Sequence, residues 1–346
     1  IHELIGGKVS VNRLREVEIT DLLRRAPTHI DNELVGTSLK GRRVLITGAG
    51  GSIGRELCRQ VARWEPAELI LLGHGENSIF EAILELKDTY HDLNMVPVIA
   101  DIRDLSRMRA IFTKYSPSVV FHTAAHKHVP LMEINIEEAI TNNIQGTQCV
   151  VKVCEEFNVD RLVMVSTDKA IRPANVMGAT KRIDEMLVLE AGHRTNEAFS
   201  VVRFGNVYGS SGSVVPLFLD QIARGGPVTV TDPEATRYFM TVREAVGLVL
   251  ASAALAKGGE VYVLDMGEPV AIGELARRLI AATALLLLLG ATGVFFGGPI
   301  YRFVTDQGTL VIETDDPDVE VVVKQGGRQI TIVDSKTGHK VNLKAG

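Results

Sequence analysis

The chain has 346 residues, 46% of them hydrophobic and 23% charged, so it is predicted to fold around a large core rather than to be disordered. Its formal net charge of -5, without a long basic run, argues against nucleic acid as the main partner, because phosphate neutralisation needs clustered Lys and Arg. The 3 cysteines have neither metal-site spacing nor the even number of a disulfide framework, which favours reduced thiols in a cytoplasmic domain.

A glycine-rich turn follows the first predicted strand. After a polar lead-in over residues 1–40, the stretch 43–57 reads as a strand, a turn and a helix with one apolar face. Glycines in such a turn let the backbone approach a pyrophosphate, whose charge is met by free N–H groups and by the positive end of the helix. Both flanks of the motif are correct, so we predict a dinucleotide site. Its residues are Thr47, Gly48, Gly51, Ser52, Ile53 and Gly54.

The ends of the next strands indicate how the rest of the cofactor lies. His74 follows the strand 69–72, where an acidic residue normally binds the ribose hydroxyls of NAD. Without that carboxylate a 2′-phosphate is not repelled and His74 attracts it, so the cofactor is expected to be NADP or NAD. Two further strands, 96–100 and 119–122, run into residues that are expected to lie against the cofactor. These residues are Asp101, Ile102, Ala124 and Ala125.

The loop that begins at residue 122 is rich in basic side chains. His122, His126 and His128 have no carboxylate or Cys partner at the spacing of known metal sites, so no metal is predicted. Lys127 is expected to hold a diphosphate or a developing oxyanion beside the cofactor. The alternative for Lys127 is an ordinary solvated loop lysine.

Polar and charged residues gather where the strand 162–165 ends. This strand reads as buried on both faces, and its carboxyl end lies at the edge where open parallel sheets bind ligands. The next helix carries Met177 and Lys181 one turn apart, so Lys181 can reach back toward the strand end. Asn143 lies inside an earlier predicted helix, where an amide is mildly unfavourable; we place it in the cofactor site, linked to Lys181 or to a structural water. The residues at the strand end are Ser166, Thr167, Asp168 and Lys169.

A smaller, substrate-covering lobe is predicted mainly from residues 205–240 and 257–278. The strand 200–204 runs into a long polar turn, 205–213, whose glycines and hydrogen-bond donors suit a sugar diphosphate. Arg237 is a candidate phosphate clamp, with a surface ion pair as the alternative. The residues expected to bind substrate are Lys127, Asn206, Ser213, Val214 and Arg237.

From about residue 13 to residue 280 the chain resembles the CapD-like polysaccharide-biosynthesis branch of the extended short-chain dehydrogenases/reductases, the nucleotide-sugar 4,6-dehydratases. The resemblance implies an α/β fold with a Rossmann-like doubly wound parallel sheet. It also implies that a UDP-N-acetylhexosamine, most often UDP-GlcNAc, is converted to its 4-keto-6-deoxy form on a tightly bound NAD or NADP. We further expect a homo-oligomer. The motifs that carry the resemblance span residues 47–54, 126–133, 166–170, 175–181, 203–206, 209–214, 237–240 and 264–269.

The resemblance also assigns catalytic roles. Asp168 takes the place of the acid that helps the C6 hydroxyl to leave, and Lys169 moves the C5 proton or holds the enolate. Thr167 and Lys181 take the places of the superfamily's hydroxyl partner and of its lysine. Met177 stands where the superfamily normally has Tyr, and a thioether cannot transfer a proton. A membrane-linked branch also has Met here, so we interpret Met177 as a branch mark; the C4 hydroxyl proton must then leave by another path, for instance Thr167, water or Lys169.

The chain departs from the family after residue 279. The nucleotide-holding segment Gly-Leu-Arg-Pro-Gly-Glu-Lys is absent, and the uncharged run 279–301 is long enough to cross a bilayer, with a buried core helix as the alternative. Alternating residues over 302–346 predict a small β tail. We therefore expect an NAD(P)-binding domain over 41–278 in the cytoplasm, attached to the bacterial inner membrane, with the tail on the outer side. The chain begins with Ile1, which suggests the downstream part of a longer product.

Three functions follow from these patterns. The first is the 4,6-dehydratase. The second is a nucleotide-sugar C4 epimerase or reductase, which the adjacent Asp168 and Lys169 disfavour because simple C4 chemistry needs neither. The third is a non-catalytic, membrane-tethered nucleotide-sugar binding module, which Met177 and the missing nucleotide segment would explain.

Overall fold

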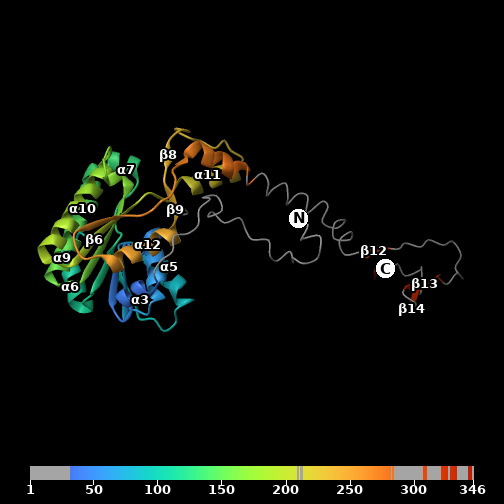
Figure 1. The fold of residues 1–346 in the computed structure, drawn as a ribbon, viewed down its shortest axis with the longest axis horizontal. Coiled ribbons are helices and arrows are strands. Elements are labelled where there is room, and N and C mark those ends of the chain that lie inside the picture. Colours follow the sequence, from blue (N-terminus) through green and yellow to red (C-terminus); the bar gives the residue numbers. More distant parts are fainter. Residues whose placement is uncertain are drawn as a thin grey trace. The chain divides into compact units, whose positions relative to one another are not determined.

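The computed structural model describes residues 32–208, 210, 213–281 and 283, together with the short strands of the tail (Figure 1). The chain divides into two compact units, and the larger one spans residues 17–276. The predicted lead-in up to residue 31 lies outside the described residues, and so does most of the predicted membrane span over 279–301.

Seven strands of the larger unit form one parallel sheet, in the order β10-β6-β5-β4-β1-β2-β3. The chain starts near the middle and winds outward in both directions, which confirms the predicted Rossmann-like doubly wound sheet. The winding changes direction between β1 and β4, and the carboxyl ends of these two strands frame the crevice where such folds bind ligands. The strands are β1 (Arg43–Thr47), β2 (Glu68–Gly73), β3 (Met95–Ile99), β4 (Val119–His122), β5 (Arg161–Thr167), β6 (Ala198–Phe204) and β10 (Glu260–Val263).

Helices cover both faces of this sheet (Figure 1). Successive strand residues point to opposite faces, so Val44 and Ile46 join one core while Leu45 joins the other. Both cores are apolar, which explains why β1, β2 and β5 read as continuous hydrophobic runs. One face is covered by α3 (Asn32–Leu39), α4 (Ser52–Ala62), α5 (Glu76–Lys87) and α12 (Val242–Leu255), and the other by α6 (Leu105–Tyr115), α9 (Gly146–Glu156) and α10 (Val176–Thr195).

Short and irregular elements follow the carboxyl ends of the strands. Between β4 and α9 the chain forms two short helices and a π-helical turn, and after β5 it forms a single 3-10 turn. Irregular helical turns of this kind occur often at functional sites. These elements are α7 (Val129–Ile134), α8 (Ile136–Ala139), η2 (Ile140–Gln145) and η3 (Asp168–Ala170).

A smaller lobe follows β6. β7 (Asn206–Tyr208) pairs in parallel with β9 (Phe239–Thr241), and β8 (Thr236–Arg237) pairs antiparallel with β11 (Val270–Ala271). The helix α11 (Val214–Ala223) lies between β7 and β8 in the chain, and residues 272–281 are helical. The lobe thus comes from the segments after residue 205, as the polar turn and the short strand signals predict.

The tail contains two short antiparallel pairs, the pairing that its alternating residues predict. β12 (Gln307–Thr309) pairs with β15 (Asn342–Lys344), and β13 (Val321–Gln325) pairs with β14 (Arg328–Ile332). Every helix in the described part of the chain is too short or too polar to cross a bilayer.

Candidate active site

The backbone of the glycine turn after β1 passes very close to the start of the loop after β4 and to the first turn of α4. Gly48 has φ +66, and a Cβ at this position would stand 2.8 Å from the backbone nitrogen of Ala124. A Cβ at Gly54 would overlap the carbonyl oxygen of Gly48. Both positions therefore require glycine, and the turn leads directly into the positive end of α4.

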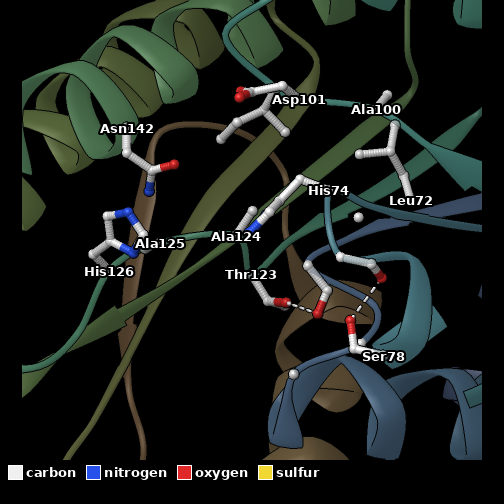
Figure 2. A pocket seen from close by; sticks show the side chains of 16 residues that line it. Leu72, His74, Ser78, Ala100, Asp101, Thr123, Ala124, Ala125, His126 and Asn142 are labelled. Atoms are coloured by element: carbon white, nitrogen blue, oxygen red, sulfur yellow. Dashed lines mark hydrogen bonds between the residues drawn. The ribbon is translucent and has the colours of Figure 1, made fainter. Parts of the chain in front are cut away.

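A cavity of about 220 Å³ opens above this turn (Figure 2). His74 and Asp101 line it from the ends of β2 and β3, and Ala124 and Ala125 from the end of β4, as predicted. Asn142, which the sequence did not single out for this role, lines it from η2. The predicted cofactor residues in its wall are Gly48, Gly51, His74, Asp101, Ile102, Ala124 and Ala125.

Asp101 carries a charge in the wall of this cavity, and it is already paired. Arg103 Nη2 lies 2.7 Å from Asp101 Oδ2, and its Nε bonds to the same carboxylate. The hydrogen bonds from Arg103 hold the pKa of Asp101 below its usual range. A negative charge there is thus compensated within the chain, with His74 facing the same cavity.

Thr47 supports the turn rather than lining the cavity. Its side chain is fully buried, and its Oγ1 lies 2.7 Å from Nδ1 of His122. The same oxygen accepts the backbone N–H groups of Thr123 at 3.2 Å and Ala124 at 3.4 Å. Thr47 therefore ties the end of β1 to the end of β4. Ser52 and Gly54 begin α4 outside the cavity wall, and Ile53 lines a second cavity instead.

Asn143 also acts as a support. Its Oδ1 accepts the N–H of His126 at 2.8 Å, and its Nδ2 donates to the His126 carbonyl at 3.1 Å and to Thr180 Oγ1 at 3.0 Å. It is fully buried and lines neither cavity. The predicted link to Lys181 is therefore a link to its neighbour Thr180, which joins η2 to the loop after β4 and to α10.

The second cavity, of about 280 Å³, lies at the end of β5 and adjoins the first, because Thr123, Ala125 and His126 line both. A ligand group in one cavity is thus within reach of a group in the other. The predicted catalytic and substrate residues in its wall are Thr167, Lys169, Met177, Lys181, Lys127, Asn206 and Ser213.

Three side chains at the end of β5 form one hydrogen-bonded group. Lys169 Nζ lies 2.9 Å from Asp168 Oδ1, and the Thr167 hydroxyl donates to the same oxygen at 2.9 Å. Lys169 Nζ also bonds to Asn206 Oδ1 at 3.3 Å. Asp168 is not part of the cavity wall, but its neighbours Thr167 and Lys169 are, and both orient its carboxylate.

Lysine side chains give this cavity a positive character. Lys127, Lys169 and Lys181 all line it, and no Asp or Glu is among the described lining residues. Partial burial lowers the pKa of Lys127 below its usual range, although the residue as a whole stays exposed. Such a site attracts anionic ligands.

The histidines do not form a metal centre among the described residues, where no group of three His, Cys, Asp or Glu is suitably placed. His122 is buried between Thr47 and Thr147, with its Nε2 3.0 Å from Thr147 Oγ1. Burial, together with the nearby charge of Lys181, lowers the pKa of His122 to about 3, so it is neutral at ordinary pH.

Comparison with known sequences shows which family the chain belongs to. The model of a family described as "Polysaccharide biosynthesis protein" matches residues 44–290. The chain belongs to this family. The capsular polysaccharide biosynthesis protein CapD of Staphylococcus aureus is 54% identical over 282 residues, which cover 81% of this chain and 47% of that protein. The chain spans about half the length of the first curated relatives that it matches.

This polysaccharide biosynthesis protein is also similar to a second curated protein and to a solved structure. A UDP-N-acetylglucosamine 4,6-dehydratase (inverting) of Campylobacter jejuni is 35% identical over 228 residues, 64% of this chain and 66% of that protein. The X-ray structure of Pen from Bacillus thuringiensis matches with a TM-score of 0.68 at 35% identity, over 72% of this chain and 76% of that chain.

A fourth comparison concerns the fold alone. The dTDP-glucose 4,6-dehydratase DesIV of Streptomyces venezuelae, solved with NAD and TYD, matches with a TM-score of 0.62 at 24% identity, over 70% of this chain and 81% of that chain. The sequence matches make this polysaccharide biosynthesis protein a CapD-like extended short-chain dehydrogenase/reductase. It is related to nucleotide-sugar dehydratases and epimerases.

Two predicted substrate residues of this family member do not face either cavity. Val214 begins α11 outside the cavity wall. Arg237 is exposed on β8, where its Nη1 donates to the carbonyl of Thr236 at 2.8 Å. Arg237 is therefore not among the residues that line either described cavity.

The sequence analysis did not identify two buried acidic residues of α10 as part of the site. Glu185 is fully buried. Its Oε1 accepts hydrogen bonds from Arg203 Nε at 2.7 Å and from Ser166 Oγ at 2.7 Å. Asp184, also fully buried, pairs with Lys181 at 3.3 Å. The available signal was the pair of acidic residues three and four positions after Lys181, which a helix places on the same side as the lysine.

Proposed function

We propose that the chain is an NAD(P)-dependent nucleotide-sugar 4,6-dehydratase that converts a UDP-N-acetylhexosamine, with UDP-GlcNAc as the first candidate, to its 4-keto-6-deoxy form. The observation that carries the proposal is the hydrogen-bonded group of Thr167, Asp168 and Lys169 beside a cavity that shares wall residues with the glycine-turn cavity. A hydroxyl, a carboxylate and an ammonium in this position can act on a sugar held next to a nicotinamide.

The first cavity fits a dinucleotide. Gly48, Gly50 and Gly51 leave room for a pyrophosphate beside the N-terminus of α4, and a Cβ at Gly48 would clash with the backbone of Ala124. His74 and Asp101 would face the ribose and the adenine. When bound, NAD(P) would take the hydride from C4 of the sugar and return it to C6, so it is regenerated in each turnover.

The second cavity supplies groups for the sugar diphosphate. Lys127 and Lys169 provide positive charge, and Asn206 provides an amide at the start of the polar turn. The Ser213 hydroxyl is buried in the cavity wall and has no hydrogen-bond partner among the described residues, so a ligand oxygen would satisfy it. These donors suit an anionic, hydroxyl-rich ligand.

Two proton transfers fall to the residues at the end of β5. Asp168 would give a proton to the C6 hydroxyl so that it leaves as water. Lys169, whose Nζ lies 2.9 Å from the same carboxylate, would hold the C5 proton or the enolate that forms beside the C4 ketone. Thr167 donates to Asp168 and keeps its carboxyl group oriented.

A second candidate is a nucleotide-sugar binding module without turnover, which Met177 favours because a thioether in the cavity wall cannot transfer a proton. Incubation of the purified chain with UDP-GlcNAc and NAD or NADP, followed by mass spectrometry, separates the possibilities. A 4-keto-6-deoxy product supports the dehydratase. A C4 epimer detected by chromatography would indicate an epimerase, and unchanged substrate that binds the protein would indicate the binding module.

We also propose that residues 279–301 attach this domain to the inner membrane, as their uncharged composition suggests. The catalytic domain would then lie in the cytoplasm and the tail outside. Recovery of the expressed chain from a membrane pellet only with detergent would support this arrangement, while full recovery in detergent-free buffer would contradict it. Light scattering in the same preparation tests the expected homo-oligomer.

A further inference from the structure

A buried carboxylate lies next to the lysine of the second cavity. Asp184 follows Lys181 by three residues on α10, and its Oδ2 lies 3.3 Å from Lys181 Nζ. Asp184 is 0% exposed, whereas Lys181 is 5% exposed and lines the cavity. Neither oxygen of Asp184 has a well-aligned hydrogen bond among the described residues. A buried charge with so few partners is costly, which points to a role beyond packing.

The proposed reaction needs a proton acceptor at this place. Oxidation of the C4 hydroxyl to a ketone releases the hydroxyl proton, and Met177, four residues before Lys181, cannot accept it. The Lys181 ammonium can accept a proton only if it passes one of its own protons on. Asp184 is the one carboxylate that lies within 4.0 Å of Lys181 Nζ in the described part of the chain.

We propose that Asp184 is the positioning residue of Lys181 and that it takes up, through this lysine, the proton lost by the C4 hydroxyl. This inference rests on the proposed dehydratase function. The O–H bond breaks toward Lys181 Nζ as the C4 carbonyl forms, and one N–H proton of Lys181 moves to Asp184 Oδ2. Asp168 gives one proton to the departing C6 hydroxyl, which leaves as water. Asp184 later releases its proton through Lys181 to solvent and Asp168 takes one up from solvent, so both carboxyl groups return to their starting states and the cycle neither gains nor loses a proton.

Asp184 changes its charge near neutral pH, whereas its buried neighbours His122 and Glu185 do not. Burial raises the pKa of Asp184 to about 6, and Lys181, followed by the hydroxyl of Thr147 on α9, partly opposes this rise. His122 on β4 stays neutral because its pKa is about 3. Burial alone would raise the pKa of Glu185, but hydrogen bonds, above all from Arg203 on β6, keep it below its usual range, so Glu185 stays ionised.

The test compares Asp184→Asn with the unchanged chain over a range of pH, using UDP-GlcNAc as substrate. In the unchanged chain, kcat/KM is expected to fall as the pH drops through about 6, because Asp184 then already carries a proton. In Asp184→Asn the rate above pH 7 is expected to fall about 100-fold and the acid limb to disappear. An active variant with the original rate and pH profile would overturn the inference.

A second variant and a matched control complete this test. Thr147→Val removes the hydroxyl that favours the charged form of Asp184, so the acid limb is expected to move to higher pH. Glu190→Gln neutralises an exposed carboxylate of the same helix, which pairs with Arg194, and should leave the profile unchanged. An acid limb that stays in place in Thr147→Val would count against Asp184.

An infrared titration separates this inference from the proposed function. The carbonyl band of a protonated buried carboxyl group is expected to disappear as the pH rises through about 6 in the unchanged chain, and to be absent in Asp184→Asn. A chain that forms no 4-keto-6-deoxy product at any pH removes the proposed function and, with it, the proton route. An active chain whose band shows no such titration overturns only the role of Asp184.

Discussion

Lys169 Nζ lies 2.9 Å from Oδ1 of Asp168, its neighbour in the chain, and both side chains stand at the end of a strand buried on both sides. Adjacent residues rarely contact each other so closely in a strand, because their side chains point to opposite faces. Here β5 ends at Thr167 and a 3-10 turn begins, which brings the carboxylate and the ammonium together. The chemistry of the site therefore depends on where the strand stops.

Asp168→Asn is expected to abolish dehydration while the cofactor stays bound. The amide keeps the shape of the carboxyl group but cannot give up a proton, so turnover should fall by roughly 100- to 10,000-fold. Mass spectrometry of the sugar product measures the loss, and the absorbance of bound nicotinamide cofactor measures retention. Asp160→Asn, which changes an exposed carboxylate paired with Arg42, serves as the control. Undiminished product formation would remove Asp168 from the mechanism.

Gly54→Ala is expected to weaken cofactor binding at least about tenfold. The new methyl group would overlap the Gly48 carbonyl oxygen, so the turn itself must shift. Calorimetric titration with NAD and with NADP measures the change and shows which of the two is preferred. Gly41→Ala is the control, because a Cβ at Gly41 has no atom within 4 Å, while the φ of +68 strains the added alanine at a position outside both cavities. If both variants bind the cofactor equally well, the turn does not hold the pyrophosphate.

Met177→Leu is expected to leave kcat nearly unchanged. Met177 is buried against Met132 and Ala139, and a side chain of similar volume should cost less than about 1.5 kcal/mol of stability. Steady-state kinetics and thermal unfolding measure the two effects. A large fall in kcat without a loss of stability would show that the sulfur takes part in the reaction.

Lys127→Ala is expected to raise KM for the nucleotide sugar about tenfold or more and to change kcat less. Lys127 lines the second cavity, and burial already lowers the pKa of its ammonium, so a bound diphosphate would give it the anionic partner that it lacks. Lys40→Ala, which removes an exposed lysine paired with Glu65, is the control. Equal KM values for both variants would place the diphosphate elsewhere.

Asp184→Asn is also expected to change how stability depends on pH. The folded-state pKa of Asp184, about 6, lies above its ordinary value of 3.8, so its contribution to stability is fully present below pH 3.8 and is lost as the pH rises through about 6. Because a tenfold change in proton affinity is worth about 1.4 kcal/mol, the loss is roughly 3 kcal/mol. Urea unfolding from pH 4 to pH 7 should show this decline in the unchanged chain and not in the variant. Parallel curves would contradict a buried, titrating Asp184.

The prediction of the sheet, and of which residues follow its strands, succeeded because those features are local in the sequence. Hydrophobic strands buried on two faces read as continuous apolar runs, and a glycine turn between strand and helix has few other uses. For the same reason Gly48, Ala124 and Lys169 could be placed at one edge before any coordinates, since the carboxyl ends of parallel strands meet there. The family motifs then supplied the roles of residues 167–169.

Tertiary packing decided what those patterns leave open. Thr47 and Asn143 were predicted to touch the cofactor, yet both turn inward and tie strand ends and helices together, because their hydrogen-bond partners come from segments distant in the sequence. Arg237 was predicted to clamp a phosphate, yet its strand lies at an exposed edge. Asp184 gained its importance from burial, which raises its pKa beside Lys181. The residue types thus determined which chemistry was available, and the packing of α10 against the sheet determined which charges are kept from water.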